Sequence, residues 1–225
     1  MNDVVYILGH QKDYEELRYS LRSLQFIPHG RVWFVGAPPP SWCQDVYHIH
    51  VDQEPGRENI WANQRTNIYA AATSSHVSDE FILMNDDFVF VRPIWPIPII
   101  HGGHLRSHRT WRDHPTNYTR YYGWAVEHGI TDPFYFAEHR AMLMEKEVMA
   151  EVHEAVSHID KYPVPTAYGN AAGLVDRIGC VQGEDATTEW GEGEWQLATF
   201  EGTFHVERYG VRVRDLLKTP SRYER

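Results

Sequence analysis

The chain is poor in cysteine, in positive charge and in long hydrophobic runs. Its two cysteines, Cys43 and Cys180, exclude a disulfide framework and a cysteine-rich zinc site. Its 31 acidic residues outnumber the 21 basic ones and give a net charge of −10. This charge argues against a protein that binds nucleic acid mainly through its phosphates, but it is compatible with a local basic groove. No apolar run approaches the ~20 residues that span a bilayer, and the start lacks the pattern of a signal peptide. We therefore expect a soluble, cytoplasmic protein with no membrane span.

Apolar and aromatic residues are plentiful: 42% of the chain is hydrophobic, with 13 Tyr, 9 Phe and 8 Trp. We expect a single domain over residues 1–225 rather than two small ones. In the first half, apolar runs alternate with segments whose apolar residues recur every three or four positions. This alternation predicts an α/β fold with a mostly parallel sheet flanked by helices. The expected strands are residues 4–8, 31–36, 46–51 and 81–84, and the expected helices are residues 14–25 and 58–73.

The pattern becomes irregular after Val91. Three prolines between residues 93 and 98 exclude a helix and restrict any strand to an edge. Residues 101–129 show no clear periodicity, whereas residues 137–158 carry apolar side chains at helical spacing. Further along, we expect a loop over residues 169–194, a strand at residues 203–206 and a short helix near residues 210–217.

One stretch, Phe81–Val91, is unusual because two adjacent carboxylates, Asp86 and Asp87, interrupt an apolar sequence. Neighbouring carboxylates amid apolar residues repel each other and resist desolvation. A divalent cation would remove this conflict, since hard cations prefer oxygen ligands, and such a cation commonly holds the phosphates of a nucleotide. The stretch therefore points to a nucleotide-sugar transferase that depends on Mn²⁺ or Mg²⁺. The alternative is an ordinary turn, for which Asn-Asp-Asp is well suited.

Ligands of open α/β sheets bind beyond the carboxyl ends of the strands. Three such ends are expected at Gly9, at Gly36 and at Asn85–Asp87. We therefore expect them to line one crevice although they are far apart in the sequence.

The chain resembles the Stealth-type proteins in the sequence and the order of three blocks, Glu16–Ser23, Pro40–Trp42 and Asn85–Asp87. These are sugar-phosphate transferases of bacterial capsule synthesis, related to the lysosomal-enzyme N-acetylglucosamine phosphotransferase of animals. The chain also resembles short actinobacterial and phage proteins usually labelled glycosyltransferase. The resemblance implies a GT-A-like fold, a UDP-sugar-type donor and a divalent cation. From the change of pattern along the chain we expect a nucleotide-binding half at residues 1–100 and an irregular acceptor-facing half at residues 101–225. If the protein is phage-encoded, we expect it in the host cytoplasm.

The second half departs from the family pattern. The family usually has His-x-Pro before a lysine, whereas this chain has His139-Arg-Ala141 ahead of Lys146. The usual arginine is missing before Tyr168–Asn170, and the Asp-Val-Lys pattern is reduced to Asp185-Ala-Thr187. These departures leave open whether a sugar-1-phosphate or only the glycosyl group is transferred.

The candidate donor-binding residues are polar groups of the first half. Arg18 and Arg22 lie four apart on one helix face and suit a diphosphate, although Glu15 could pair with Arg18 on a solvated face. Asn63 falls where the family has an asparagine in the helix before the acidic motif. The complete set is Gly9, Arg18, Arg22, Asn63 and Asn85.

The candidate catalytic residues are His139, Lys146 and Asp185. His139 is expected to open the helix at residues 137–158, where it would act as a general base or bind the transferred phosphate. Lys146, two helical turns further on, would bind phosphate or be one charge on a solvated surface. His205 is a further candidate metal ligand beside Asp86 and Asp87.

The aromatic and basic residues between positions 104 and 124 suit an acceptor site, because aromatic faces stack on sugars or bases and arginine contacts phosphates. Their candidates are Arg109, Trp111, Arg112 and Tyr122. The alternative is an aromatic cluster that packs on itself.

The favoured function is a metal-dependent glycosyltransferase with a nucleotide-sugar donor and a polysaccharide, protein or DNA acceptor. The alternatives are a Stealth-type sugar-1-phosphate transferase that releases UMP, a glycosyltransferase acting on hydroxylated DNA bases, and a non-catalytic sugar- or nucleotide-binding module.

Overall fold

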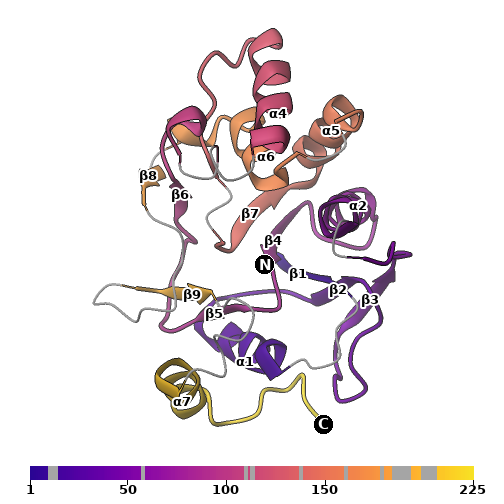
Figure 1. Cartoon of the computed structure of the whole chain (residues 1–225). Helices are drawn as coiled ribbons and strands as arrows, with labels where there is room; N and C mark the ends of the chain where they lie inside the picture. Colours follow the sequence, from indigo (N-terminus) through magenta and orange to yellow (C-terminus); the bar gives the residue numbers. More distant parts are fainter. Residues whose placement is uncertain are drawn as a thin grey trace.

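The computed structural model describes residues 1–9, 15–56, 59–108, 111, 115–136, 139–159, 162–177, 180–183, 194–198 and 207–225. Its centre is a five-stranded sheet with the strand order β3-β2-β1-β4-β7 (Figure 1). The first four strands pair in parallel, and β7 pairs antiparallel with β4. The α/β class and the mostly parallel sheet flanked by helices are therefore confirmed. These strands are β1 (Asp3–Leu8), β2 (Val32–Gly36), β3 (Tyr47–His50), β4 (Glu80–Met84) and β7 (Met142–Glu145).

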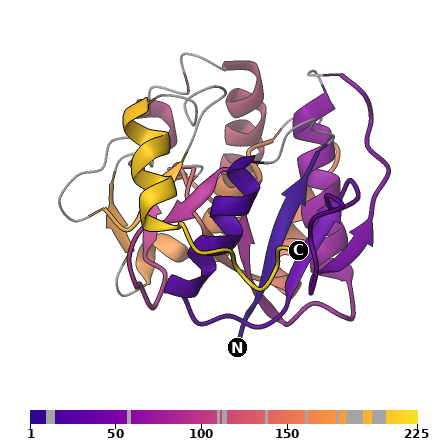
Figure 2. The ribbon, with the colours of Figure 1, turned by 90° about the horizontal axis from the view of Figure 1, so that it is seen from below.

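The lower face of the sheet in Figure 1 is covered by α1 (Glu15–Ser23) and α7 (Glu207–Leu216). Figure 2 shows these two helices side by side across this face. A 3-10 turn, Leu24–Phe26, continues α1. Alternate residues of β1 point to this side, where Tyr6 and Leu8 pack against Leu17 and Leu21 of α1. Such burial on both faces is typical of a central parallel strand.

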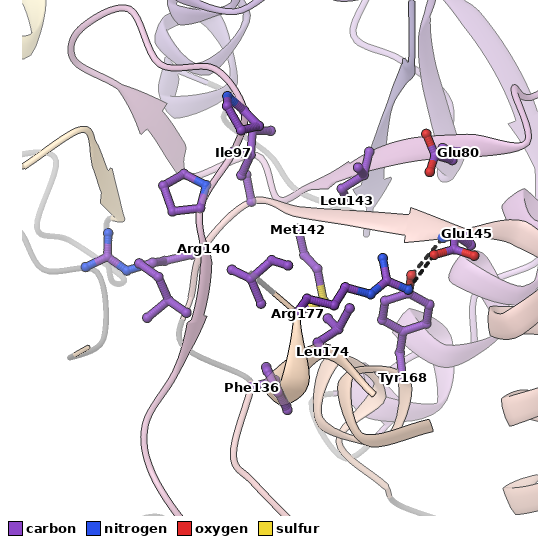
Figure 3. A pocket seen from close by; sticks show the side chains of 15 residues that line it. Glu80, Ile97, Phe136, Arg140, Met142, Leu143, Glu145, Tyr168, Leu174 and Arg177 are labelled. Carbon is purple, nitrogen blue, oxygen red and sulfur yellow. Dashed lines mark hydrogen bonds and ion pairs between the residues drawn. The ribbon is translucent and has the colours of Figure 1, made fainter. Parts of the chain in front are cut away.

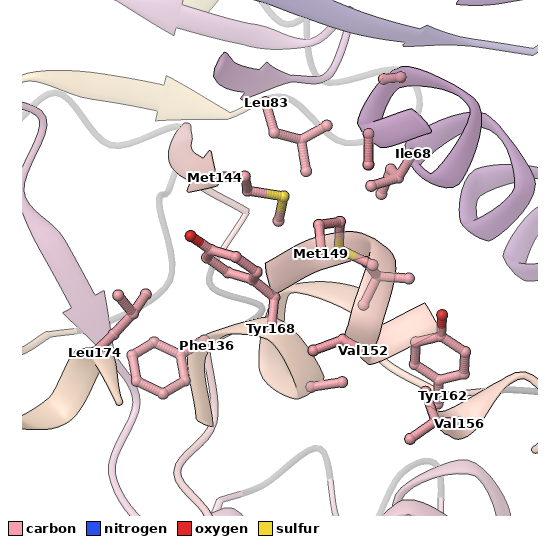
Figure 4. Close-up of a cluster of buried hydrophobic side chains, with 14 of the residues drawn as sticks. Ile68, Leu83, Phe136, Met144, Met149, Val152, Val156, Tyr162, Tyr168 and Leu174 are labelled. Carbon is pink, nitrogen blue, oxygen red and sulfur yellow. The ribbon is translucent and has the colours of Figure 1, made fainter. Parts of the chain in front are cut away.

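The upper face carries the larger core. It is built from the sheet and four helices: α2 (Ile60–Thr73), α4 (Pro115–Glu127), α5 (Lys146–Val156) and α6 (Val164–Ala171). Figure 4 shows Met149 of α5 and Tyr168 of α6 beside Met144 of β7. Within the described residues, no helix is both long and apolar enough to cross a membrane.

Two small sheets flank the main one. Strand β5 (Phe88–Phe90) pairs antiparallel with β9 (Gln196–Ala198), and β6 (Ile99–His101) pairs in parallel with β8 (Cys180–Gln182). Short 3-10 turns at Leu105–Ser107 and Leu174–Asp176 complete the described elements.

Two expectations for the second half are wrong. Residues 137–158 do not form one helix, because Met142–Glu145 pairs with β4 before α5 begins at Lys146. Residues 101–129, which show no periodicity, contain α4, and the expected loop at residues 169–194 contains the end of α6 and strand β8. Helix α6 has a proline in its first turn, a position at which proline is tolerated. The expected strand at residues 203–206 lies outside the described residues.

Gly36 ends β2 with φ +113°, and a Cβ there would lie 2.3 Å from the carbonyl oxygen of Leu8. Gly36→Ala is therefore expected to lower the free energy of unfolding by about 2 kcal/mol or more, as measured by denaturant titration. Gly123→Ala is the control, because a Cβ at this exposed position in α4 would meet nothing within 4 Å in the described part of the chain. This substitution should stabilise the helix by about 0.5–1 kcal/mol. Equal effects of the two substitutions would contradict this account of Gly36.

Candidate active site

The carboxyl ends of the parallel strands meet at one edge of the sheet, as predicted. Leu8 lies opposite Gly36 in the β1–β2 pair, and Tyr6 lies opposite Met84 in the β1–β4 pair. Gly9 and Asn85–Asp87 therefore follow neighbouring strands at the same edge. Because β7 runs antiparallel to β4, His139, which precedes β7, also lies toward this end.

The acidic pair occupies the turn between β4 and β5, closed by a 3.3 Å hydrogen bond from the Phe88 N–H to the Asn85 carbonyl. Asp87 Oδ1 is buried and accepts no hydrogen bond from the residues that the structure describes. Burial, followed by the negative charge of Asp86 and then that of Glu16, raises the pKa of Asp87 well above its usual range. A buried carboxylate oxygen without a donor requires a cation or a proton.

This arrangement fits a divalent cation. Among the described residues, no group of three or more His, Cys, Asp or Glu side chains is arranged to hold a metal ion by itself. Mg²⁺ is commonly bound through one or two carboxylates plus the phosphates of a substrate, which is what Asp86 and Asp87 would offer. The other predicted metal ligand, His205, and the predicted catalytic Asp185 lie outside the described residues.

Helices α1 and α7 bring two further groups toward Asp87. Burial, followed by the charges of Asp87 and Glu16, raises the pKa of Tyr209 on α7. Tyr209 packs with Val89 and Val213 in a small cluster between β5 and α7. Tyr209 could not be found from the sequence, because its approach to Asp87 depends on where a distant helix packs.

The structure places Lys146 away from the acidic pair, and its predicted role in binding phosphate stays a prediction. Its Nζ donates to the carbonyl oxygens of Ser74, at 2.5 Å, and Val77, at 3.2 Å. Glu145, the residue before it, lies opposite Glu80 at the start of β4. Lys146 therefore lies at the opposite end of β4 from the acidic pair and ties the start of α5 to the loop before β4.

His139 does not open a helix, contrary to expectation. It is exposed, has φ +46°, and lies three residues before β7. Gln196, a fully buried residue of β9, braces this segment: its amide donates to the His139 carbonyl at 3.3 Å and accepts from the Ala141 N–H at 2.8 Å. The general-base role of His139 stays a prediction.

Arg18 and Arg22 meet a carboxylate that the sequence pattern did not reveal. Arg22 Nε and Nη2 donate to the Glu224 carboxylate at 2.8 and 2.7 Å, and Arg18 Nη1 donates to it at 3.2 Å. Glu15, the alternative partner considered for Arg18, binds Arg214 at 3.0 Å. Both guanidinium groups thus anchor the C-terminal tail, and their contact with a donor stays a prediction.

Asn63 uses both ends of its amide on the backbone of Glu54, accepting from its N–H at 3.0 Å and donating to its carbonyl at 2.8 Å. It therefore fixes the loop after β3 to α2. Its proposed contact with a donor hydroxyl stays a prediction.

Trp111 and Tyr122 were predicted to bind the acceptor, but in the structure they pack against each other. Trp111 and Tyr122 meet edge to face with centroids 5.5 Å apart, and the Arg106 guanidinium lies 4.7 Å from the Tyr122 ring. Trp111 and Tyr122 also pack on the upper core. This is the self-packing alternative, whereas Arg109 and Arg112 lie outside the described residues.

A cavity of about 220 Å³ lies between β7 and the Pro96–Ile100 segment (Figure 3). Its wall is mostly apolar, and the 2.7 Å ion pair between Arg177 and Glu145 lies at one side. Its described lining residues do not include Asp86 or Asp87, so the cavity is separate from the acidic turn.

The fold has a distant likeness among known structures. It aligns with a galactosyltransferase, LgtC, crystallised in complex with donor and acceptor sugar analogues, with a TM-score of 0.44 and 11% identity over 80% of this chain and 72% of that chain. No protein-family model matches the chain, and no curated protein sequence matches it. The function proposed for this chain therefore depends on its own site residues.

Proposed function

We propose that the chain is a metal-dependent glycosyltransferase that uses a nucleotide-sugar donor of the UDP-sugar type. The observation that carries this proposal is the buried, unbonded Oδ1 of Asp87 beside Asp86, at the edge where the parallel strands end. This edge is the usual ligand-binding side of an open α/β sheet. A purely structural turn would not need a buried carboxylate oxygen without a hydrogen-bond donor, which costs stability.

In this proposal, Asp86 and Asp87 hold Mn²⁺ or Mg²⁺ against the donor diphosphate. The bound ion would supply positive charge that offsets the charge developing on the departing UDP. Gly9 follows β1 at the same edge, and a Cβ there would meet none of the described residues within 4 Å. His139 is the candidate base for the acceptor hydroxyl, because it lies toward this end and imidazole transfers protons near neutral pH.

Within this proposal we favour glycosyl transfer over sugar-1-phosphate transfer. Attack at phosphorus requires cationic side chains around the transferred phosphate. Lys146 is bound at the opposite end of β4, and Arg18 and Arg22 share the Glu224 carboxylate. In the structure, these three cationic side chains therefore bind groups of the protein itself.

The test is a screen of UDP-sugar donors with Mn²⁺, with and without EDTA, in which UDP and UMP release are measured separately. We expect Mn²⁺-dependent release of UDP that EDTA abolishes. Release of UMP would instead identify a sugar-1-phosphate transferase. A folded protein that binds neither UDP nor Mn²⁺ would contradict the proposal and favour a non-catalytic module.

A further inference from the structure

A buried chain of hydrogen bonds links β1, α1 and β5 next to the acidic turn. The Ser20 hydroxyl donates to the backbone carbonyl of Phe88, and the Tyr6 hydroxyl lies 2.9 Å from Ser20 Oγ. A serine hydroxyl has one proton, and here it goes to Phe88, so Tyr6 is the donor to Ser20. Both side chains belong to residues with 0% exposure, so water does not compete for these bonds.

The two ends of this chain lie on either side of the acidic pair. Phe88 directly follows Asp87, and its N–H closes the turn onto Asn85. Tyr6 lies opposite Met84, two residues before Asp86, in the β1–β4 pair. Burial raises the pKa of Tyr6, so the phenol keeps the proton that it donates. The hydrogen bonds of Tyr6 and Ser20 therefore tie the backbone that follows the acidic pair to α1 and to β1, the strand that pairs with β4 just before the acidic pair.

We propose that Tyr6 and Ser20 are positioning residues that hold Asp86 and Asp87 in the geometry required to bind a divalent cation. This inference rests on the proposed function, but it assigns residues that do not touch the cation. Without the Ser20 hydroxyl, the buried carbonyl of Phe88 loses its side-chain donor, and the turn must shift to satisfy it. Groups that hold metal ligands in place typically change metal affinity about 10–100-fold when removed.

The test measures the Kd for Mn²⁺ in the presence of UDP by electron paramagnetic resonance, and Tm in parallel, for three variants. Ser20→Ala is expected to raise this Kd about tenfold or more. Tyr6→Phe should raise it by a smaller factor, because Ser20 still reaches Phe88. Ser23→Ala is the matched control: Ser23 is equally buried on α1 and donates to the Ser20 carbonyl at 2.6 Å. It should lower Tm and leave the Kd unchanged.

An unchanged Kd in folded Ser20→Ala protein, or an equal rise in Ser23→Ala, would overturn the positioning role while the proposed function stands. If Ser20→Ala does not fold, Tyr6→Phe decides, since it removes a single oxygen atom, and an unchanged Kd in that variant overturns the role. Wild-type protein that binds no Mn²⁺ with UDP would contradict the proposed function, and the positioning role with it.

Discussion

Asp87→Asn is expected to abolish turnover and at the same time to stabilise the protein. The substitution keeps the shape of the side chain but removes one of the two proposed metal ligands, so kcat/KM should fall about 10³-fold or more. The same change removes a buried carboxylate whose Oδ1 has no hydrogen-bond donor within the described part of the chain. We therefore expect the free energy of unfolding to rise by about 1–3 kcal/mol at pH 8.

The stabilisation should depend on pH with a defined sign. The pKa of Asp87 in the folded protein is raised above the ordinary value of 3.8. Below pH 3.8 both folded and unfolded chains are protonated, and the substitution changes little. As the pH rises, the unfolded chain loses this proton first, so the wild-type protein loses stability while the variant does not. Denaturant unfolding at pH 4 and pH 8 measures the difference.

Asp45→Asn is the control, because it makes the same chemical change at an exposed residue. Asp45 has φ 53°, a conformation that asparagine tolerates, so both stability and turnover should stay close to wild type. Mn²⁺ with UDP should raise the Tm of wild-type protein and of Asp45→Asn, but not that of Asp87→Asn. An Asp87→Asn protein with full activity would contradict the central assignment.

Local sequence patterns were sufficient for the first half of the fold. Apolar runs gave β1 and β4 nearly to the residue, and helical periodicity gave α1 and α2. Parallel strands joined by helices then placed Gly9 and the acidic pair at one edge of the sheet. The first half of the fold could be predicted because the local preference of each segment there agrees with the tertiary structure.

The second half could not be predicted as well, because tertiary contacts override local preference there. Residues 142–145 continue the helical spacing of α5, yet they pair with β4 as an edge strand. The partners of the candidate site residues were also hidden by distance in the sequence. Glu224 lies 202 residues from Arg22, and Ser20 lies 68 residues from Phe88. No periodicity encodes such contacts.

Glu224→Gln is expected to have the largest destabilising effect of a single charge in the C-terminal tail. Its side chain is 3% exposed and binds Arg22, whose side chain is 12% exposed. Burial by itself would raise the pKa of Glu224, but hydrogen bonds from Arg22, the Ser221 N–H and Arg18 outweigh it and hold the pKa at about 2. Removing the charge leaves the largely buried Arg22 without its anion, which should cost about 3 kcal/mol at pH 7.

The pH dependence of stability and a matched variant distinguish loss of the Glu224 charge from a nonspecific disruption of the C-terminal tail. Because the folded pKa of about 2 lies below the ordinary 4.5, the stabilisation by Glu224 is complete above pH 4.5 and is lost as the pH falls toward 2. The difference between wild type and Glu224→Gln in denaturant unfolding should therefore shrink between pH 5 and pH 3. Glu15→Gln breaks the half-exposed ion pair with Arg214 and should cost less than about 1 kcal/mol. A loss of equal size in both variants, or one that does not diminish in acid, would show that the Glu224 charge does not anchor the tail.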